Sequence, residues 1–151
     1  MTEKQPKETV SEELEPKVTG IGGIFFFSEN PETIKEWYGK NLGLAVNQWG
    51  SSFESRNVSR PDEINYLQWS PFKKGSEYFK PSEKEFMINY RVQNLEGLLI
   101  KLKENGVTVL GDVQTFDYGK FAHIMDIEGN KIELWEPVDR IFTETGGETK
   151  K

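Results

Sequence analysis

A histidine and a glutamate in one predicted hairpin are the residues best suited to do chemistry. His123 is the only histidine of the chain, and Glu133 follows it after a tight-turn sequence, Asp126-Ile127-Glu128-Gly129-Asn130. Where such a turn joins two strands, the residue numbers of each cross-strand pair sum to about 256. This register places His123 directly opposite Glu133 on one sheet face. A carboxylate orients an imidazole and raises its basicity. His123 is therefore a candidate general base, with Glu133 as its catalytic partner.

Residues on neighbouring predicted strands extend this pair into a candidate ligand site. The apolar alternates should face the helices, and they are Ile88, Tyr90, Val92, Ala122, Ile124, Ile132 and Leu134. The other face then carries Met87, Asn89, Arg91, Phe121, His123, Met125, Glu133 and Trp135. Polar groups among aromatic rings are typical of small-molecule sites. We expect a small organic ligand to contact Asn89, Arg91, Trp69, Trp135, Phe25, Phe27 and Tyr118.

The same residues also have a purely structural interpretation. Arg91 and Glu133 would then neutralise each other within the sheet, and His123 would be a wall residue hydrogen-bonded to solvent. Tyr118 would belong to a plain turn rather than close the mouth of a pocket. The sequence leaves both interpretations open.

The elements that must position these residues occur twice in the same order. The apolar run Ile24–Phe27 predicts a buried strand, and Asn30 followed by Pro31 predicts a helix that Gly43 ends. Three strands are expected after it, near Leu44–Trp49, Ser52–Arg56 and Ile64–Trp69. The second set comprises a strand at Phe86–Val92, a helix from Asn94 to Asn105-Gly106, and strands at Val107–Leu110, Phe121–Met125 and Lys131–Trp135.

Two such βαβββ modules resemble the vicinal oxygen chelate (VOC) superfamily of glyoxalase, bleomycin-resistance and dioxygenase-like proteins. The segments that carry the resemblance are NPETIKEWYGKNLGL, FMINYRVQNLEGLLIKLKENGV and the closing hairpin FAHIMDIEGNKIELWEP, in which Ile127 replaces a usual proline. The resemblance covers about Val18 to Pro137. It implies an α+β fold with module 1 at about 18–70, a linker at 71–84 and module 2 at about 85–138. Residues 1–17 and 139–151 are expected to be tails, the first of them disordered.

The resemblance also implies where a metal would bind. Family members with a divalent cation use four inward side chains, and the matching positions here are Gly23, Met87, Glu133 and one near 65–69. Only Glu133 is a suitable ligand for a hard cation. We therefore expect a small-molecule-binding protein of the resistance type without a metal cofactor. The alternatives are a lyase, isomerase or dioxygenase acting through His123 and Glu133, and an unusual divalent-metal site on those two residues.

The composition of the chain limits the kinds of partner that we expect it to bind. The net charge is -6, with 25 acidic and 19 basic residues, and no basic face for nucleic acid is apparent. No apolar run is long enough to span a membrane, and the N-terminal sequence lacks the apolar stretch of a secretory signal. Cysteine is absent, which permits a reducing compartment, so a cytoplasmic protein is expected. By analogy with the fold we also expect a homodimer.

Overall fold

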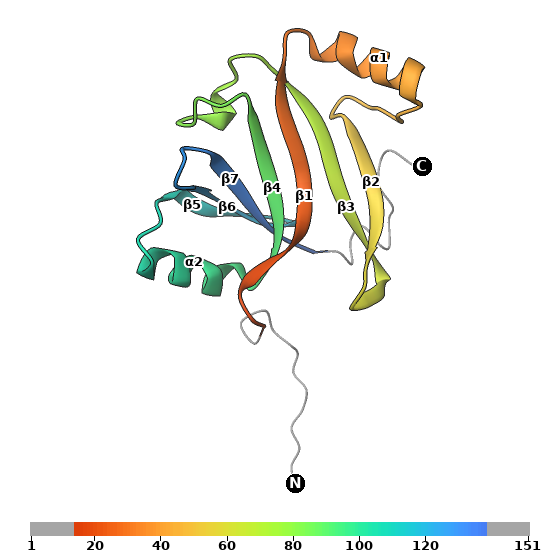
Figure 1. The fold of residues 1–151 in the computed structure, drawn as a ribbon. Helices are drawn as coiled ribbons and strands as arrows, with labels where there is room; N and C mark the ends of the chain where they lie inside the picture. The colour runs from red at the N-terminus through yellow and green to blue at the C-terminus, as the bar shows by residue number, and fades with distance from the viewer. Residues whose placement is uncertain (1–13, 139–151) are drawn as a thin grey trace.

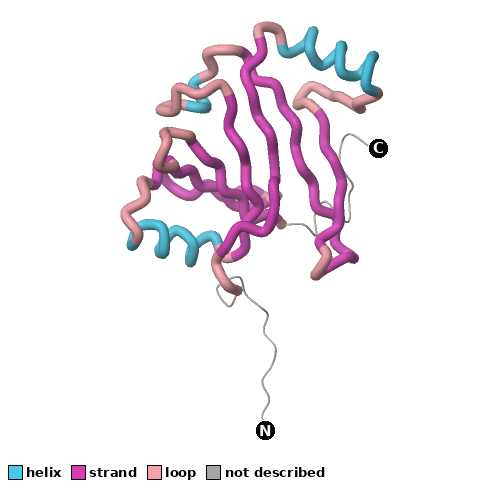
Figure 2. Tube along the Cα trace, in the orientation of Figure 1, coloured by secondary structure: helices cyan, strands magenta, loops and turns pink. Residues whose placement is uncertain are grey.

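The computed structural model describes residues 14–138, which form one curved, mixed seven-stranded sheet with two α-helices (Figures 1 and 2). The order of strands across the sheet is β2-β3-β1-β4-β7-β6-β5. The elements are β1 (Lys17–Ser28), α1 (Pro31–Leu42), β2 (Ser51–Asn57), β3 (Arg60–Lys73), the short 3₁₀ helix η2 (Glu77–Phe79), β4 (Phe86–Gln93), α2 (Leu95–Glu104), β5 (Val109–Phe116), β6 (Gly119–Met125) and β7 (Lys131–Pro137). The predicted α+β class is confirmed.

The two halves of the sheet share one pairing scheme. In the first half β1 pairs in parallel with β3, which pairs antiparallel with β2. In the second half β4 pairs in parallel with β7, and β7, β6 and β5 continue antiparallel. Strands β1 and β4 join the halves antiparallel at the centre of the sheet. The second half has the expected βαβββ order, whereas the first half has βαββ within the described residues.

The missing strand is the one predicted at Leu44–Trp49. That segment is a loop with a single bridge between Asn47 and Gly50. The buried ammonium of Lys35, on α1, donates to the carbonyls of Asn47 and Gln48 at 3.2 and 3.0 Å. A lysine side chain thus satisfies backbone groups that a strand would have paired along a ladder.

Helix positions follow the local signals in the sequence. The side chain of Asn30 accepts a hydrogen bond from the amide of Thr33, and Gly43 ends α1 in the left-handed region at φ 72°. Helix α2 packs on the predicted apolar face, where the buried residues are Val92, Leu95, Leu98, Leu99, Ala122, Ile124 and Leu134. The predicted division of the second half into an apolar and a polar face is confirmed.

The two ends of the predicted domain differ from expectation. Most of the predicted tails, residues 1–13 and 139–151, lie outside the described residues. Residues 14–17 do not behave as part of a tail, because β1 begins at Lys17. The carbonyls of Leu14 and Glu15 accept hydrogen bonds from the side chains of Asn94 and Gln93, at 2.9 and 2.7 Å.

The predicted linker at 71–84 is partly strand and partly packed against the sheet. Strand β3 continues to Lys73, which pairs with Ser28 of β1. In η2, Phe79 is only 1% exposed and stacks on Phe27 with ring centroids 4.6 Å apart and an interplanar angle of 2°. Burial of that ring fixes the segment against the inner face of the sheet, defined here as the face that carries Glu133.

Candidate functional site

Glu133 and His123 lie at the centre of the inner face. They are paired residues of the antiparallel strands β7 and β6, as the hairpin register predicts. Nε2 of His123 is 2.9 Å from Oε2 of Glu133, and both side chains are largely buried. The predicted register is therefore confirmed, and it rests on the alternation that turns Ile124, Ile132 and Leu134 toward α2.

Two further side chains complete the hydrogen bonding of the carboxylate. Asn89 is paired with Glu133 across the parallel strands β4 and β7, and its Nδ2 donates to Oε1 at 2.7 Å. The hydroxyl of Tyr78, on η2, donates to Oε2. Glu133 thus accepts hydrogen bonds from three different elements, η2, β4 and β6. We refer to Asn89, Tyr78, His123 and Glu133 as the polar cluster.

Tyr78 is the functional candidate that the sequence did not reveal. It lies in the segment interpreted as a linker, where no periodicity assigns a side chain to a face. Its ring stacks on Phe72 at 5.8 Å and contacts His123 edge-on at 5.6 Å. Nζ of Lys131 donates to its carbonyl at 2.7 Å and lies over its ring. The one available signal was the pair Tyr78-Phe79, two aromatic rings in an otherwise polar stretch.

The ionisation of the polar cluster follows from these contacts. Burial alone would raise the pKa of Glu133, but hydrogen bonds from His123, Tyr78 and Asn89, with the charge of His123, outweigh it and lower that pKa. Burial and the neighbouring charge of Glu133 raise the pKa of Tyr78 well above its ordinary value. Burial lowers the pKa of Lys131. Glu133 is thus held as a carboxylate, and Tyr78 remains a hydrogen-bond donor.

Arg91 and the aromatic residues lie beside the polar cluster. Arg91 is buried, donates from Nη1 to the carbonyl of Tyr66 at 3.2 Å, and lies 5.3 Å from the ring of Trp135. Trp135 stacks on Phe121 at 5.7 Å with an interplanar angle of 6°. Tyr118 is 43% exposed and lies edge-on to Phe121, and its carbonyl accepts a hydrogen bond from the indole of Trp135. These residues form an aromatic wall along the inner face.

The other predicted ligand contacts divide between the two faces. Phe25 and Phe27 lie near Phe72 and Phe79, on the inner face. Trp69 does not, because it packs against Tyr38 of α1 at 4.8 Å and against Phe26 at 5.4 Å. The prediction that Trp69 lines the same surface as Glu133 is wrong. In β3 its position alternates with Gln68 and Ser70, the pairing partners of Gly23 and Phe25.

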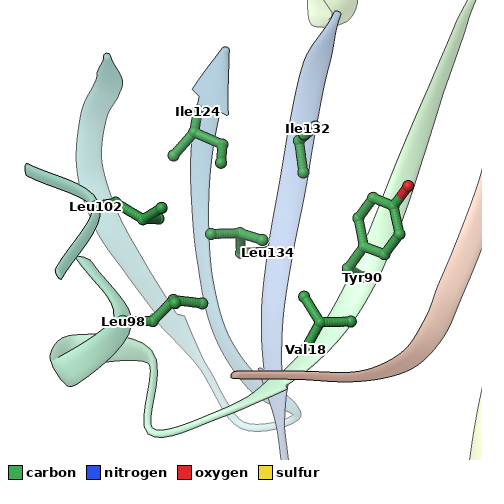
Figure 3. Close-up of a pocket in the computed structure, with 7 residues that line it drawn as sticks. All are labelled: Val18, Tyr90, Leu98, Leu102, Ile124, Ile132 and Leu134. Atoms are coloured by element: carbon green, nitrogen blue, oxygen red, sulfur yellow. The ribbon is translucent and has the colours of Figure 1, made fainter. Parts of the chain in front are cut away.

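The opposite face has a pocket of a different character. Figure 3 shows apolar side chains converging between α2, the strands of the second half and the start of β1. Its volume is ≈ 250 Å³, and its lining residues are Val18, Tyr90, Leu98, Leu102, Ile124, Ile132 and Leu134. No side chain of the polar cluster lines this pocket, so the two features lie on different faces of the sheet.

The positions that the resemblance implies for a divalent ion do not suit one here. Gly23 offers no side chain, and Met87 is fully buried against Phe25 and Phe79. Gln68, which pairs with Gly23, is hydrogen-bonded to Ser52, Ser70 and the carbonyl of Trp49. Within residues 14–138 no group of three His, Cys, Asp or Glu side chains could hold a metal ion. The donor set therefore does not fit the implied cation.

Comparison with known proteins identifies the fold. No family model and no curated protein match the sequence. A methylmalonyl-CoA epimerase of Streptomyces coelicolor in complex with 2-nitronate-propionyl-CoA matches with a TM-score of 0.60 at 15% identity, over 81% of this chain and 99% of that chain. The epimerase of Mycobacterium tuberculosis gives 0.55 at 19% identity, over 82% and 91%. A catechol 2,3-dioxygenase gives 0.51 at 17% identity, over 82% of this chain and 41% of that chain.

These likenesses show the fold of the chain. The chain has the vicinal oxygen chelate fold, as its helix and hairpin segments indicated. At such low identities the shared feature is the fold, and function depends on the site. In the part of the chain that the structure describes, no helix is long and apolar enough to cross a membrane.

Proposed function

We propose that this protein binds a small organic molecule on the inner face of its sheet, in the manner of glyoxalase- and bleomycin-resistance-like proteins, without a divalent metal. The observation that carries the proposal is the hydrogen bonding of Glu133. Both of its carboxylate oxygens accept hydrogen bonds from neighbouring side chains, Asn89 at Oε1 and His123 and Tyr78 at Oε2.

A cation that took both oxygens of Glu133 would have to displace at least one donor, because Oε2 already accepts two hydrogen bonds. A buried donor left without a partner costs about 1–3 kcal/mol, so the ion would lose part of its binding free energy before gaining other ligands. The other matching positions, Gly23 and Met87, would supply no ligand atom suited to a hard ion. The site is better suited to an organic ligand held between aromatic rings, with polar contacts at one end.

Proteins of the same fold support the class of ligand. One matching methylmalonyl-CoA epimerase structure contains methylmalonyl-CoA, and another contains 2-nitronate-propionyl-CoA. Both are organic molecules bound by proteins of this fold. For this chain the supporting feature is its own aromatic wall, in which Trp135 and Phe121 stack beside the polar cluster.

An enzyme is the second candidate, and the His123–Glu133 contact favours it. An imidazole held by an ionised carboxylate at 2.9 Å is a general base near neutral pH in many enzymes. A lyase, isomerase or dioxygenase-like reaction on a small organic substrate would then use His123 and Glu133 as its catalytic residues. We further propose a homodimer, by analogy with the fold, and a cytoplasmic location, which the cysteine-free sequence permits.

Native mass spectrometry of the purified full-length protein, with elemental analysis of the same sample, tests the proposal. We expect no stoichiometric divalent metal, a dimer mass, and a co-purified or added organic ligand. Zn, Ni, Mn or Fe should leave the melting temperature unchanged, because only a ligand that binds the native state raises it. A rise of several degrees at low micromolar metal, absent in the Glu133→Gln variant, would contradict the metal-free function.

A further inference from the structure

The contact with Glu133 determines which ring nitrogen of His123 carries the proton. Nε2 faces Oε2 of Glu133 at 2.9 Å, and the carboxylate is an acceptor because its pKa is lowered. When the ring is neutral, Nε2 therefore carries its proton and Nδ1 presents a lone pair. The tautomer is thus fixed by a hydrogen bond at the other nitrogen.

Among residues 14–138, no side chain or backbone group forms a hydrogen bond with Nδ1 of His123, since both of the ring's hydrogen-bond contacts are made by Nε2. The buried side-chain atoms there that lack a hydrogen bond are Glu63 Oε1, Asn65 Nδ2 and Asn89 Oδ1, and Nδ1 of His123 is not one of them. The side chain of His123 is 13% exposed. The polar cluster thus offers a hydrogen-bond acceptor at the surface of the inner face.

Tyr78 holds this arrangement in place. Its hydroxyl donates to Oε2 of Glu133 and lies 3.3 Å from Nε2 of His123, so it contacts both members of the pair. The residue is itself fixed by the stack on Phe72, by the bond from Lys131 to its carbonyl, and by the buried ring of Phe79 next to it. Without the hydroxyl, Glu133 loses a donor at the oxygen that orients the imidazole.

We propose that Tyr78 is a positioning residue that locks Glu133 onto Nε2 of His123, and that the site consequently takes neutral, planar ring compounds that donate an N–H or O–H group to Nδ1. This inference rests on the proposed small-molecule function and narrows its ligand class. In such a complex the donor group of the ligand would bond Nδ1 of His123, and its planar ring would lie along the neighbouring aromatic side chains.

The planar and neutral character of the ligand follows from the surroundings of His123. Phe121 lies two residues before it on the same face of β6 and stacks on Trp135. The ring of Tyr78 contacts the imidazole edge-on at 5.6 Å. Aromatic walls favour flat ligands. The cations of Lys131 and Arg91 border the polar cluster and disfavour a cationic donor, whereas an anionic ligand would have to approach Glu133.

Two matched pairs of aromatic probes test the ligand class with the unaltered full-length protein. The first pair is 4-nitroaniline and N,N-dimethyl-4-nitroaniline, and the second is indole and 1-methylindole, all of them neutral near pH 7. Each pair shares a ring, but only the first member has a donor. We expect the donor member of each pair to bind at least tenfold more tightly by equilibrium dialysis. Equal affinities, or no binding of either member, would overturn the inference.

Nitrogen-15 NMR of the single histidine provides a measurement that needs no variant. In the unliganded protein the neutral ring should show its proton on Nε2, and 4-nitroaniline should shift the Nδ1 signal. A proton on Nδ1 would overturn the assignment. A protein that binds both members of each pair equally would retain a small-molecule site, so the inference would fail while the proposed function stands.

The role of Tyr78 requires a variant that keeps its ring. Tyr78→Phe preserves the stack on Phe72 and removes the hydroxyl. We expect it to reduce the preference for the donor member to threefold or less and to shift the His123 ring toward a mixture of tautomers. Tyr38→Phe, on the helix-covered side next to Trp69, is the matched control and should change neither. If Tyr78→Phe keeps the full preference and a single tautomer, the positioning role is wrong.

Discussion

Gly22 packs so closely on Asn89 that a Cβ at residue 22 would lie 2.3 Å from Oδ1 of that amide. The same Cβ would lie 3.0 Å from Cγ of Arg91 and 3.0 Å from a ring carbon of Trp135. Asn89 must stay in place because its Nδ2 donates to Glu133. The absent side chain of Gly22 is therefore a requirement of the polar cluster.

Gly22→Ala should destabilise the protein by about 1–3 kcal/mol, since overpacking a closed site displaces its neighbours. It should also weaken the bond from Asn89 to Glu133. Gly20→Ala is the matched control, because its Cβ would meet only Cδ of Arg91 at 3.9 Å, an ordinary contact. Urea unfolding of both variants measures the difference. Equal stability of the two variants would show that the inner face can accommodate a Cβ at residue 22.

The stability of the protein should depend on pH through Glu133. Its folded-state pKa is lowered, so its contribution is fully present above the unfolded value of about 4.3 and is lost as pH falls through the folded value. Glu133→Gln should cost about 1–3 kcal/mol near neutral pH. The difference between variant and unaltered protein should shrink in acid below about pH 4. Urea unfolding across pH 3–7 checks this, and a difference constant over that range would contradict it.

Much of the site could be predicted from alternation and one turn. Period-two patterning fixes faces wherever one face is buried, so the placement of Asn89, Arg91, His123 and Glu133 followed from the apolar residues between them. The hairpin sequence around Gly129 then fixed the register of His123 against Glu133. Both patterns involve residues that lie close together in the sequence, so a single sequence is enough to recognise them.

The parts that failed depend on contacts between distant segments. Tyr78 reaches Glu133 across 55 positions from a stretch without periodicity. The predicted strand at Leu44–Trp49 is a loop because Lys35 binds its carbonyls, a contact that composition cannot reveal. Trp69 was expected to contact the ligand from the end of its predicted strand, but it packs against Tyr38 on the helix-covered face.

Arg91→Ala should destabilise the protein by about 1.5–3 kcal/mol, the range for a hydrogen bond to a charged group. The guanidinium donates to the carbonyl of Tyr66 and lies over Trp135, and truncation removes both contacts. Arg56→Ala is the control, because the exposed Arg56 bonds only the nearby carbonyl of Pro61 among the described contacts. Thermal unfolding of the two variants compares them. Loss of ligand binding without loss of stability would instead assign Arg91 directly to the ligand.

Two N-terminal deletions should distinguish the contribution of residues 14 and 15 to stability from that of the residues before them. Removing residues 1–15 eliminates the carbonyl acceptors of Leu14 and Glu15 for Asn94 and Gln93, whereas removing residues 1–13 keeps them. The longer deletion should be less stable than the shorter by about 1–2 kcal/mol, because a net hydrogen bond contributes about 1 kcal/mol. Chemical unfolding of both proteins measures the difference. Equal stability would show that these two bonds contribute nothing.

The segment between the halves should prove part of the core through Phe79. Its ring is 1% exposed and stacks on Phe27, so Phe79→Ala should cost about 3–5 kcal/mol, the usual range for a buried phenylalanine. The variant should also release Tyr78 from Glu133 and reproduce the NMR signature of Tyr78→Phe at His123. Phe86→Ala, at a site 40% exposed, is the control and should cost less. A loss below about 1 kcal/mol for Phe79→Ala would show that residues 74–84 form a linker after all.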